Sequence, residues 1–252
     1  MSVSLKSLPD GYRAVVFGAT GAIGTAFLTA LGEDPRCAAR FAASRTGASV
    51  AGAPGVSFDL SDPASLDAAI ETAAQDGPLH LVIAATGALH GEKSMSPEKT
   101  WRHLDAGRLA DAFHVNTILP ALIARAALPK LARGSKDAPE KAVFAALSAR
   151  VGSISDNRLG GWHGYRASKA ALNQIIKTCS IELARKAPGA LCVALHPGTV
   201  DSRLSEPFQG NVPEGKLFSP AYAAECLLSV IDALEPEQSG LIFDWAGEEI
   251  SP

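Results

Sequence analysis

The chain has 252 residues, of which 47% are hydrophobic and 19% charged, and its formal net charge is −3. This apolar content excludes a wholly disordered chain, and the near-neutral charge offers no basic surface for nucleic acid. The length is sufficient for one large α/β domain or two small ones.

The cysteines, the histidines and the apolar runs indicate whether the chain binds a metal and in which cellular compartment it is expected. The cysteines Cys37, Cys179, Cys192 and Cys226 lie far apart without a CxxC pair, so we expect reduced thiols rather than disulfides or a zinc site. The six histidines are equally scattered, and no metal is predicted. No apolar run approaches the roughly 20 residues that span a bilayer, and residues 1–10 lack the pattern of a secretory signal. We therefore expect a cytoplasmic protein that binds neither membrane nor nucleic acid.

Short apolar runs alternate with helical patterns along the chain. Strands are predicted at 12–17, 38–43, 56–58, 79–84, 141–147, 191–195 and 241–243. Helices are predicted at 21–31, 64–74, 105–132, 164–185 and 220–234. Repeated β–α–β units predict a mostly parallel sheet with right-handed crossovers and helices on both faces. Because the sequence shows no linker or repeat, we predict that residues 1–252 form a single α/β domain, doubly wound and of the Rossmann type.

A glycine-rich turn joins the first predicted strand to the first predicted helix. Glycine lets the backbone approach a pyrophosphate closely, and the helix N-terminus supplies N–H donors. In an open α/β sheet a dinucleotide binds at this place. The predicted cofactor contacts of this turn are Gly18, Thr20, Gly21, Ala22, Ile23 and Gly24.

The end of the second predicted strand bears on the type of nucleotide. A carboxylate about 20 residues beyond the glycine turn would bind the ribose 2′-hydroxyl of NAD and repel a 2′-phosphate. This chain has Ser44 and Arg45 there, a hydroxyl and a guanidinium that suit a phosphate. NADP(H) is therefore favoured and NAD(H) is the alternative. In the competing interpretation Arg45 is a solvated loop residue.

Tyr165 and Lys169 are four residues apart in a predicted helix, which places them on one face. A phenol ordinarily has a pKa near ~10, and a nearby ammonium stabilises the phenolate and lowers that pKa. This pair is suited to proton exchange with a substrate. Although YxxxK alone is a weak signal, its position about 140 residues after the glycine turn makes it a strong one.

With these two motifs the chain resembles the short-chain dehydrogenase/reductase family over nearly its whole length. The resemblance implies catalytic roles for Tyr165, Lys169 and Asn116, together with a serine. It also implies further cofactor contacts, made by Tyr165 and Lys169 themselves and at Asp59, Leu60, Ala85, Thr86, Gly87, Pro197, Gly198, Val200 and Ser202. Residues 160–166 and 243–247 look most like the sniffer-like carbonyl reductases and their C-factor relatives.

The family's catalytic serine position falls on Ala149 in this chain. Ser148 is adjacent and Ser153 lies twelve residues before Tyr165, so either could supply the hydroxyl that binds a substrate carbonyl. Successive strand residues face opposite sides, and Ser148 therefore needs a local bend or a one-residue slip in the alignment. A site with no serine is the third alternative.

The family pattern also departs at Ala22, where a glycine is usual, and at Ala84 and Ala85, where two asparagines are usual. Asn116 carries a local signal of its own. Pro120 lies four residues later and has no N–H to give to the Asn116 carbonyl, so we predict an irregular helix there. The resemblance implies that this carbonyl holds a water that connects Lys169 to solvent.

The sequence thus predicts an NADP(H)-preferring oxidoreductase that interconverts a carbonyl and an alcohol, with Tyr165 as acid and base. Its partners would be a small-molecule substrate and, by analogy, a second copy or more in a homodimer or homotetramer. The alternative is a cofactor-binding signalling or regulatory protein on a reductase scaffold. A sugar-nucleotide epimerase is disfavoured because little chain remains after Ser202 for a substrate domain.

Overall fold

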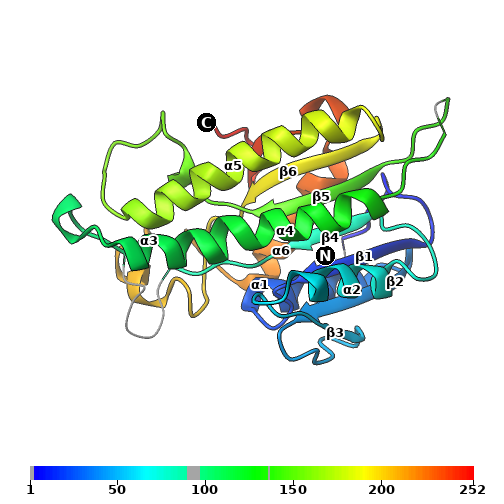
Figure 1. Cartoon of the computed structure of the whole chain (residues 1–252), viewed down its shortest axis with the longest axis horizontal. Helices are drawn as coiled ribbons and strands as arrows, with labels where there is room; N and C mark the ends of the chain where they lie inside the picture. The colour runs from blue at the N-terminus through cyan, green and yellow to red at the C-terminus, as the bar shows by residue number, and fades with distance from the viewer. Residues whose placement is uncertain (1–2, 90–96, 136) are drawn as a thin grey trace.

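The fold is built on one seven-stranded parallel sheet. The computed structural model describes residues 3–89, 97–135 and 137–252, and Figure 1 shows the sheet with helices packed along it. The strand order is β3-β2-β1-β4-β5-β6-β9, with every neighbouring pair parallel. The bounds are β1 Tyr12–Phe17, β2 Cys37–Ser44, β3 Gly55–Ser57, β4 Leu81–Ala84, β5 Ala142–Leu147, β6 Ala190–His196 and β9 Ile242–Asp244. This arrangement confirms the predicted doubly wound fold of the Rossmann type.

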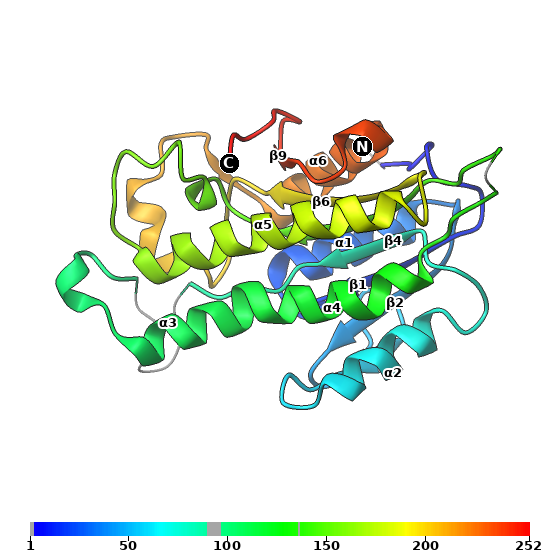
Figure 2. The same cartoon turned by 45° about the horizontal axis from the view of Figure 1, so that its top comes forward.

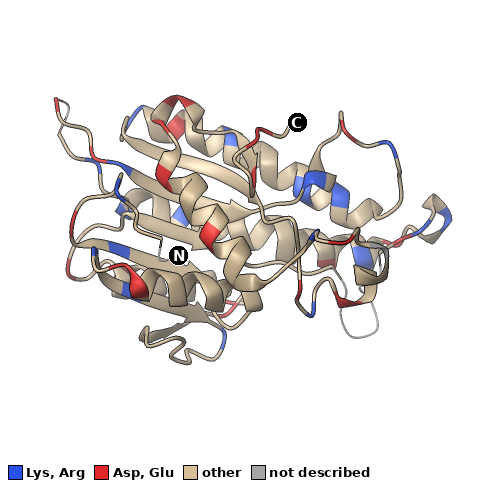
Figure 3. Cartoon of the chain, turned by 180° about the vertical axis from the view of Figure 1, so that it is seen from behind, with Lys and Arg blue, Asp and Glu red and all other residues tan. Residues whose placement is uncertain are grey.

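Helices cover both faces of the sheet. The helix bounds are α1 Ala22–Glu33, α2 Pro63–Ala73, α3 Ala106–Phe113, α4 Leu119–Ala127, α5 His163–Ala184 and α6 Pro220–Ala233. Apolar side chains of α2, α4 and α5 pack on one face, which Figure 2 shows from the front. Those of α1 and α6 form a second core on the opposite face. Figure 3 shows the chain from this side, with the charged residues coloured. The two cores together bury the sheet on both sides.

The predicted long helix at 105–132 is a chain of helical pieces. Between α3 and α4 lies a π-helical segment, His114–Ile118, in which the Leu119 N–H donates to the His114 carbonyl. After α4 comes a 3-10 turn at Leu128–Lys130. The irregularity falls where Pro120 lacks an N–H, as predicted.

Several short elements carry no periodic sequence signal and were not predicted. A separate two-stranded ribbon pairs β7, Thr199–Val200, with β8, Leu217–Phe218. Short helical turns occupy Trp101–His103, Arg150–Gly152, Glu206–Asn211 and Pro236–Gln238. The predicted strand at 79–84 begins two residues later in the structure, at Leu81.

Polar contacts, buried at Asp34 and part-buried at Lys141, lie at the amino ends of β2 and β5. Asp34, just before β2, accepts hydrogen bonds from the Leu5 N–H at 2.9 Å and the Tyr12 hydroxyl at 3.1 Å. Lys141, just before β5, donates through Nζ to the carbonyls of Asp232 and Leu234 at 2.8 and 2.6 Å. These contacts hold the N-terminal segment and the end of α6 to this edge of the sheet.

The opposite, carboxyl edge is where the strand order reverses, between β1 and β4. Ligands of open α/β sheets bind in the crevice at such a point. Within the described residues, no helix has the length and apolar character needed to cross a membrane, and no His, Cys, Asp and Glu side chains gather as a metal site.

Candidate active site

Tyr165 and Lys169 lie in the first turns of α5, at the carboxyl edge of the sheet. The Lys169 side chain is 2% exposed, and its Nζ donates a 2.7 Å hydrogen bond to the Leu147 carbonyl at the end of β5. The same Nζ lies 5.7 Å from the centre of the Tyr165 ring. The structure thus brings the phenol and the ammonium together on one helix face.

Burial shifts the pKa values of both side chains. It raises the pKa of Tyr165 to about 12 and lowers that of Lys169 to about 7, because a low-dielectric surrounding disfavours the charged form of each group. In the protein alone, burial therefore outweighs the expected lowering of the Tyr165 pKa by Lys169. At neutral pH the phenol keeps its proton and can donate it.

Asn116 braces the loop that follows β4. It is fully buried in the π-helical segment, where its Oδ1 accepts from the Ala88 N–H at 3.0 Å and its Nδ2 donates to the Ala88 carbonyl at 2.8 Å. A Cβ on neighbouring Gly87 would lie 3.4 Å from Asn116 Oδ1 and 3.7 Å from Lys169 Nζ. Gly87, Asn116 and Lys169 therefore meet at one point.

The two candidate serines have different partners. Ser148 donates to Asn173 Oδ1 at 2.7 Å, and both side chains are buried. Ser153 accepts from the Asp156 N–H at 3.1 Å and shares a longer 3.4 Å contact with the Ser155 hydroxyl. Within the described residues, no hydrogen bond joins either serine to the Tyr165 hydroxyl.

The segment that carries Ser153 packs directly on the first turns of α5. A Cβ on Gly152 would lie 2.8 Å from Lys169 Cβ, so glycine permits this close approach. Arg166 ties the same segment down, because its guanidinium donates to the Val151 carbonyl at 3.2 Å. By contrast Ser148 bonds to Asn173, which is eight residues beyond Tyr165, or about 12 Å along the helix axis.

The glycine-rich turn forms a tight cradle between β1 and α1. Gly18 has φ +77°, and a Cβ there would lie 2.7 Å from the Ala85 carbonyl oxygen. A Cβ on Gly24 would overlap the Gly18 carbonyl oxygen. Gly21 begins α1 without a side-chain cap, so the first N–H groups of the helix are available to a ligand. The departure at Ala22 leaves this turn intact, because Ala22 is exposed in the first turn of α1.

Residues beside the cradle fit a dinucleotide. The Thr86 hydroxyl is buried and has no partner within the described part of the chain, and a buried polar group without a partner is costly unless a ligand satisfies it. Ala85 is held by its N–H, which donates to the Phe17 carbonyl at 2.9 Å. An orphaned hydroxyl next to a cradle of uncapped N–H groups suits a cofactor with phosphate and ribose oxygens.

The remaining predicted cofactor residues lie along the same edge. Ser44 is buried at the end of β2 with its hydroxyl 3.3 Å from that of Thr46, while Arg45 is exposed. Asp59 is exposed and Leu60 half-buried, just after β3. After β6 come Pro197, Gly198, Val200 and Ser202, whose hydroxyl donates to the Val200 carbonyl at 3.2 Å.

One residue of this region was not found from the sequence. Glu98 is buried, and its carboxylate accepts from the Gly164 N–H, next to Tyr165, at 3.1 Å. It lies 67 positions before Tyr165 in a polar stretch without periodicity, so no motif could have indicated the contact.

Residues 13–212 match the short chain dehydrogenase family, and the chain belongs to that family. The C-signal protein of Myxococcus xanthus is 34% identical over 147 residues, which are 58% of this chain and 80% of that protein. The NADPH-bound carbonyl reductase from chicken fatty liver superimposes with a TM-score of 0.79 at 26% identity, covering 96% of this chain and 99% of that one.

The carbonyl reductase Sniffer of Drosophila melanogaster has the same fold, with a TM-score of 0.80 at 22% identity over 95% of this chain and 99% of that one. The resemblance to sniffer-like and C-factor-like proteins is thereby confirmed. The protein belongs to a family of oxidoreductases.

Proposed function

We propose that the protein is an NADP(H)-preferring reductase that interconverts a small-molecule carbonyl compound and its alcohol. The observation that carries this proposal is the meeting of Tyr165, Lys169 and Asn116 beside the glycine cradle, on the carboxyl edge of the sheet. The similarity to an NADPH-bound carbonyl reductase supports the choice of cofactor and reaction. When bound, NADPH supplies the hydride that adds to the carbonyl carbon.

The chain's own residues supply the proton and the positioning. Tyr165 gives its phenolic proton to the carbonyl oxygen as negative charge develops there. Lys169, fixed by the Leu147 carbonyl, keeps its Nζ beside the ring, and Asn116 holds the β4 loop in place. The cradle would hold the cofactor phosphates, and Thr86 would donate to one of its oxygens. The test is fluorescence titration with NADPH and NADH, followed by turnover assays on aldehydes and ketones.

Ser153 is our candidate for the hydroxyl that orients the substrate carbonyl. Its segment contacts the first turns of α5, and its 3.4 Å contact with Ser155 is weak enough to exchange for a substrate oxygen. Ser153→Ala is expected to lower kcat about a hundredfold, the lower end of the cost of one lost oxyanion donor. The measurement is steady-state kinetics at saturating NADPH.

Ser148→Ala is the matched control. Because Ser148 donates to Asn173 inside the core, its loss is expected to lower the free energy of unfolding by about 1 kcal/mol and to leave kcat nearly unchanged. The reverse pattern, with kcat lost in Ser148→Ala and kept in Ser153→Ala, would assign the role to Ser148.

Arg45 is expected to set the cofactor preference. It is exposed just after β2, at the position where the 2′-phosphate of NADP(H) would bind. Arg45→Asp should weaken NADPH binding about ten- to hundredfold, equivalent to the roughly 1.5–3 kcal/mol of one charge-assisted hydrogen bond, and should improve NADH binding. Dissociation constants come from fluorescence titration. The control is Arg185→Asp, an exposed site at the far end of α5, and equal losses in both variants would refute a specific role.

A cofactor-binding regulatory protein is the second candidate function. Two observations favour it: Ala149 occupies the family's serine position, and neither nearby serine is bonded to Tyr165 within the described residues. The similarity to the C-signal of Myxococcus xanthus agrees with it. NADPH binding without turnover on any carbonyl, and insensitive to Tyr165→Phe, would select this candidate.

We also propose a homodimer or homotetramer. Ile118, in the helical segment before α4, and Ile181, on α5, are 44% and 50% exposed. Their adjacent helices pack together, so apolar side chains of both helices are available for pairing with a second copy.

A further inference from the structure

Helix α5, which carries Tyr165, begins without a cap of its own. Three other helices are each capped by the side chain of their N-cap residue, namely Asp62 for α2, Asp105 for α3 and Ser219 for α6. In α5 the N-cap residue is Trp162, which makes no side-chain cap, and the first turn holds no acidic residue. The first N–H groups of a helix need partners when they are buried.

Glu98 provides this missing cap from a distant part of the chain. Its Oε2 accepts from the Gly164 N–H at 3.1 Å, and its main-chain carbonyl accepts from the Trp162 N–H at 2.6 Å. These two bonds hold the N-cap residue, Trp162, and the second residue of the helix, Gly164. They also hold Trp162 at φ +53°, a left-handed conformation that a bulky residue adopts only under constraint.

The site is shaped for a carboxylate. A Cβ on Gly164 would lie 3.0 Å from Glu98 Oε1, so glycine leaves the room that the carboxylate occupies. Glu98 is 4% exposed, and within the described residues no cation pairs with it. The carboxyl group therefore lies at the positive end of the α5 dipole, which favours an acidic side chain, and it accepts from a main-chain N–H there.

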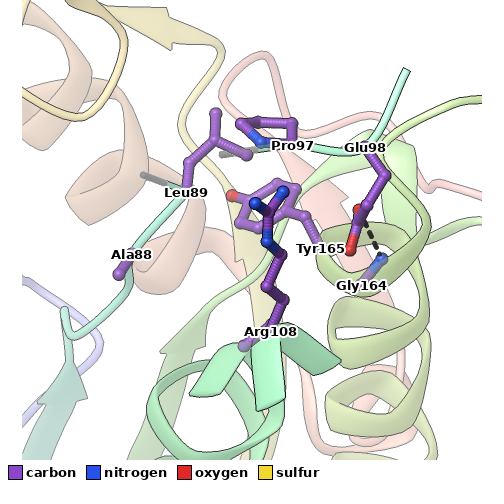
Figure 4. A pocket seen from close by; sticks show the side chains of 8 residues that line it. Ala88, Leu89, Pro97, Glu98, Arg108, Gly164 and Tyr165 are labelled. Atoms are coloured by element: carbon purple, nitrogen blue, oxygen red, sulfur yellow. Dashed lines mark hydrogen bonds between the residues drawn. The ribbon is translucent and has the colours of Figure 1, made fainter. Parts of the chain in front are cut away.

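Figure 4 shows Glu98 and Tyr165 on the wall of one small cavity, with the dashed bond from Glu98 to Gly164. The cavity has a volume of about 20 Å³ and is also lined by Leu89 and Arg108. Tyr165 directly follows Gly164 in the first turn of α5. Any fraying of that turn moves the phenol, because helix ends open first when their N–H groups lose their partners.

We propose that Glu98 is a positioning residue for Tyr165: its carboxylate and carbonyl clamp the start of α5 and so fix the place of the phenol. This proposal rests on the proposed reductase function. It makes the segment after residue 97 part of the catalytic arrangement, although Glu98 itself touches no reacting atom.

Two substitutions test the clamp. Glu98→Ala removes the acceptor and is expected to lower kcat about ten- to hundredfold, the effect of a misplaced catalytic group, with the NADPH dissociation constant unchanged. Glu98→Gln keeps an acceptor oxygen of the same reach and is expected to restore most of kcat. Should Glu98→Ala fail to fold, Gly164→Ala displaces the carboxylate from the other side and is expected to lower kcat in the same way.

Asp34→Asn and Asp34→Ala are the matched controls. Asp34 is also a buried carboxylate that accepts from main-chain N–H groups, but it lies at the amino edge of the sheet. Its variants are expected to lower the urea midpoint without changing kcat. Unchanged kcat in a folded Glu98→Ala variant, or equal losses of kcat in the Glu98 and Asp34 variants, would overturn the proposal.

A second measurement is independent of turnover. The chain has three tyrosines, so ¹³Cζ-labelled tyrosine gives three resonances, and Tyr165→Phe assigns that of Tyr165. In Glu98→Ala the Tyr165 resonance is expected to shift or broaden while those of Tyr12 and Tyr222 remain in place. An unmoved Tyr165 resonance would overturn the proposal. Absence of turnover in the unaltered protein would contradict the reductase function alone, since this resonance would still decide the role of Glu98.

Discussion

Tyr165→Phe is expected to lower carbonyl reduction about 100- to 10,000-fold, the usual contribution of a general acid. The variant removes the hydroxyl, which is the proposed proton donor, and keeps the ring, whose centre lies 5.7 Å from Lys169 Nζ. Because the cradle is untouched and only one hydroxyl is lost, the NADPH dissociation constant should change far less than the rate. Steady-state kinetics and fluorescence titration measure the two quantities. Full turnover in the Phe variant would show that the proton comes from another group.

The pH dependence follows from the same hydroxyl. Burial raises the pKa of Tyr165 to about 12, so the phenol keeps its proton through the neutral range. The proton that carbonyl reduction needs is therefore present at neutral pH. Alcohol oxidation needs the phenolate, whose fraction grows as the pH rises toward that pKa. The rate of oxidation should therefore increase with pH in the unaltered protein, and Tyr165→Phe should abolish this increase. An oxidation rate that falls as pH rises would contradict the assignment.

Gly24→Ala is expected to weaken NADPH binding about a hundredfold, or about 2.7 kcal/mol. The new methyl group would overlap the Gly18 carbonyl and lie 3.1 Å from Ala19 Cα, so the cradle must open to admit it. Crowding of this kind also costs about 1–3 kcal/mol of folding free energy. Titration with NADPH and urea unfolding measure the two effects separately.

Gly32→Ala is the control on the same helix. The three atoms nearest to a Cβ there belong to the guanidinium of Arg40, which can move aside at the cost of its bond to the Ala51 carbonyl, and alanine favours the helix. NADPH binding should be unchanged in this variant. Equal loss of binding in both variants would show that the effect arises from α1 as a whole rather than from the cradle.

Most of the fold could be predicted from the sequence because its elements are long and periodic. Continuous apolar runs indicated β1, β4 and β5, and the helical spacing indicated α5 to within one residue at each end. The two-residue strands β7 and β8 escaped prediction, since so short a pairing depends on tertiary contacts rather than on a local pattern. The π-helical segment was foreseen only as an irregularity, because Pro120 predicts a missing bond but not the bond that replaces it.

The candidate site likewise has residues that could be predicted from the sequence and residues that could not. Tyr165 and Lys169 could be indicated from their four-residue spacing in a predicted helix, and Asn116 from the family resemblance. The structure brings the three side chains together. The serine could not be assigned, since strand alternation does not reveal that the Ser148 hydroxyl is taken by Asn173. Glu98 left no signal at all, because its partner N–H belongs to a helix that only the folded chain brings near.

The contacts of Asp34 and Lys141 have a consequence for how this protein can change. They fasten the amino edge of the sheet, whereas the cradle and the tyrosine lie at the carboxyl edge. The length of the strands separates these polar contacts from the proposed active site. Substitutions at the amino edge are therefore expected to change thermal stability, and those at the carboxyl edge to change the proposed activity, with little effect of one on the other.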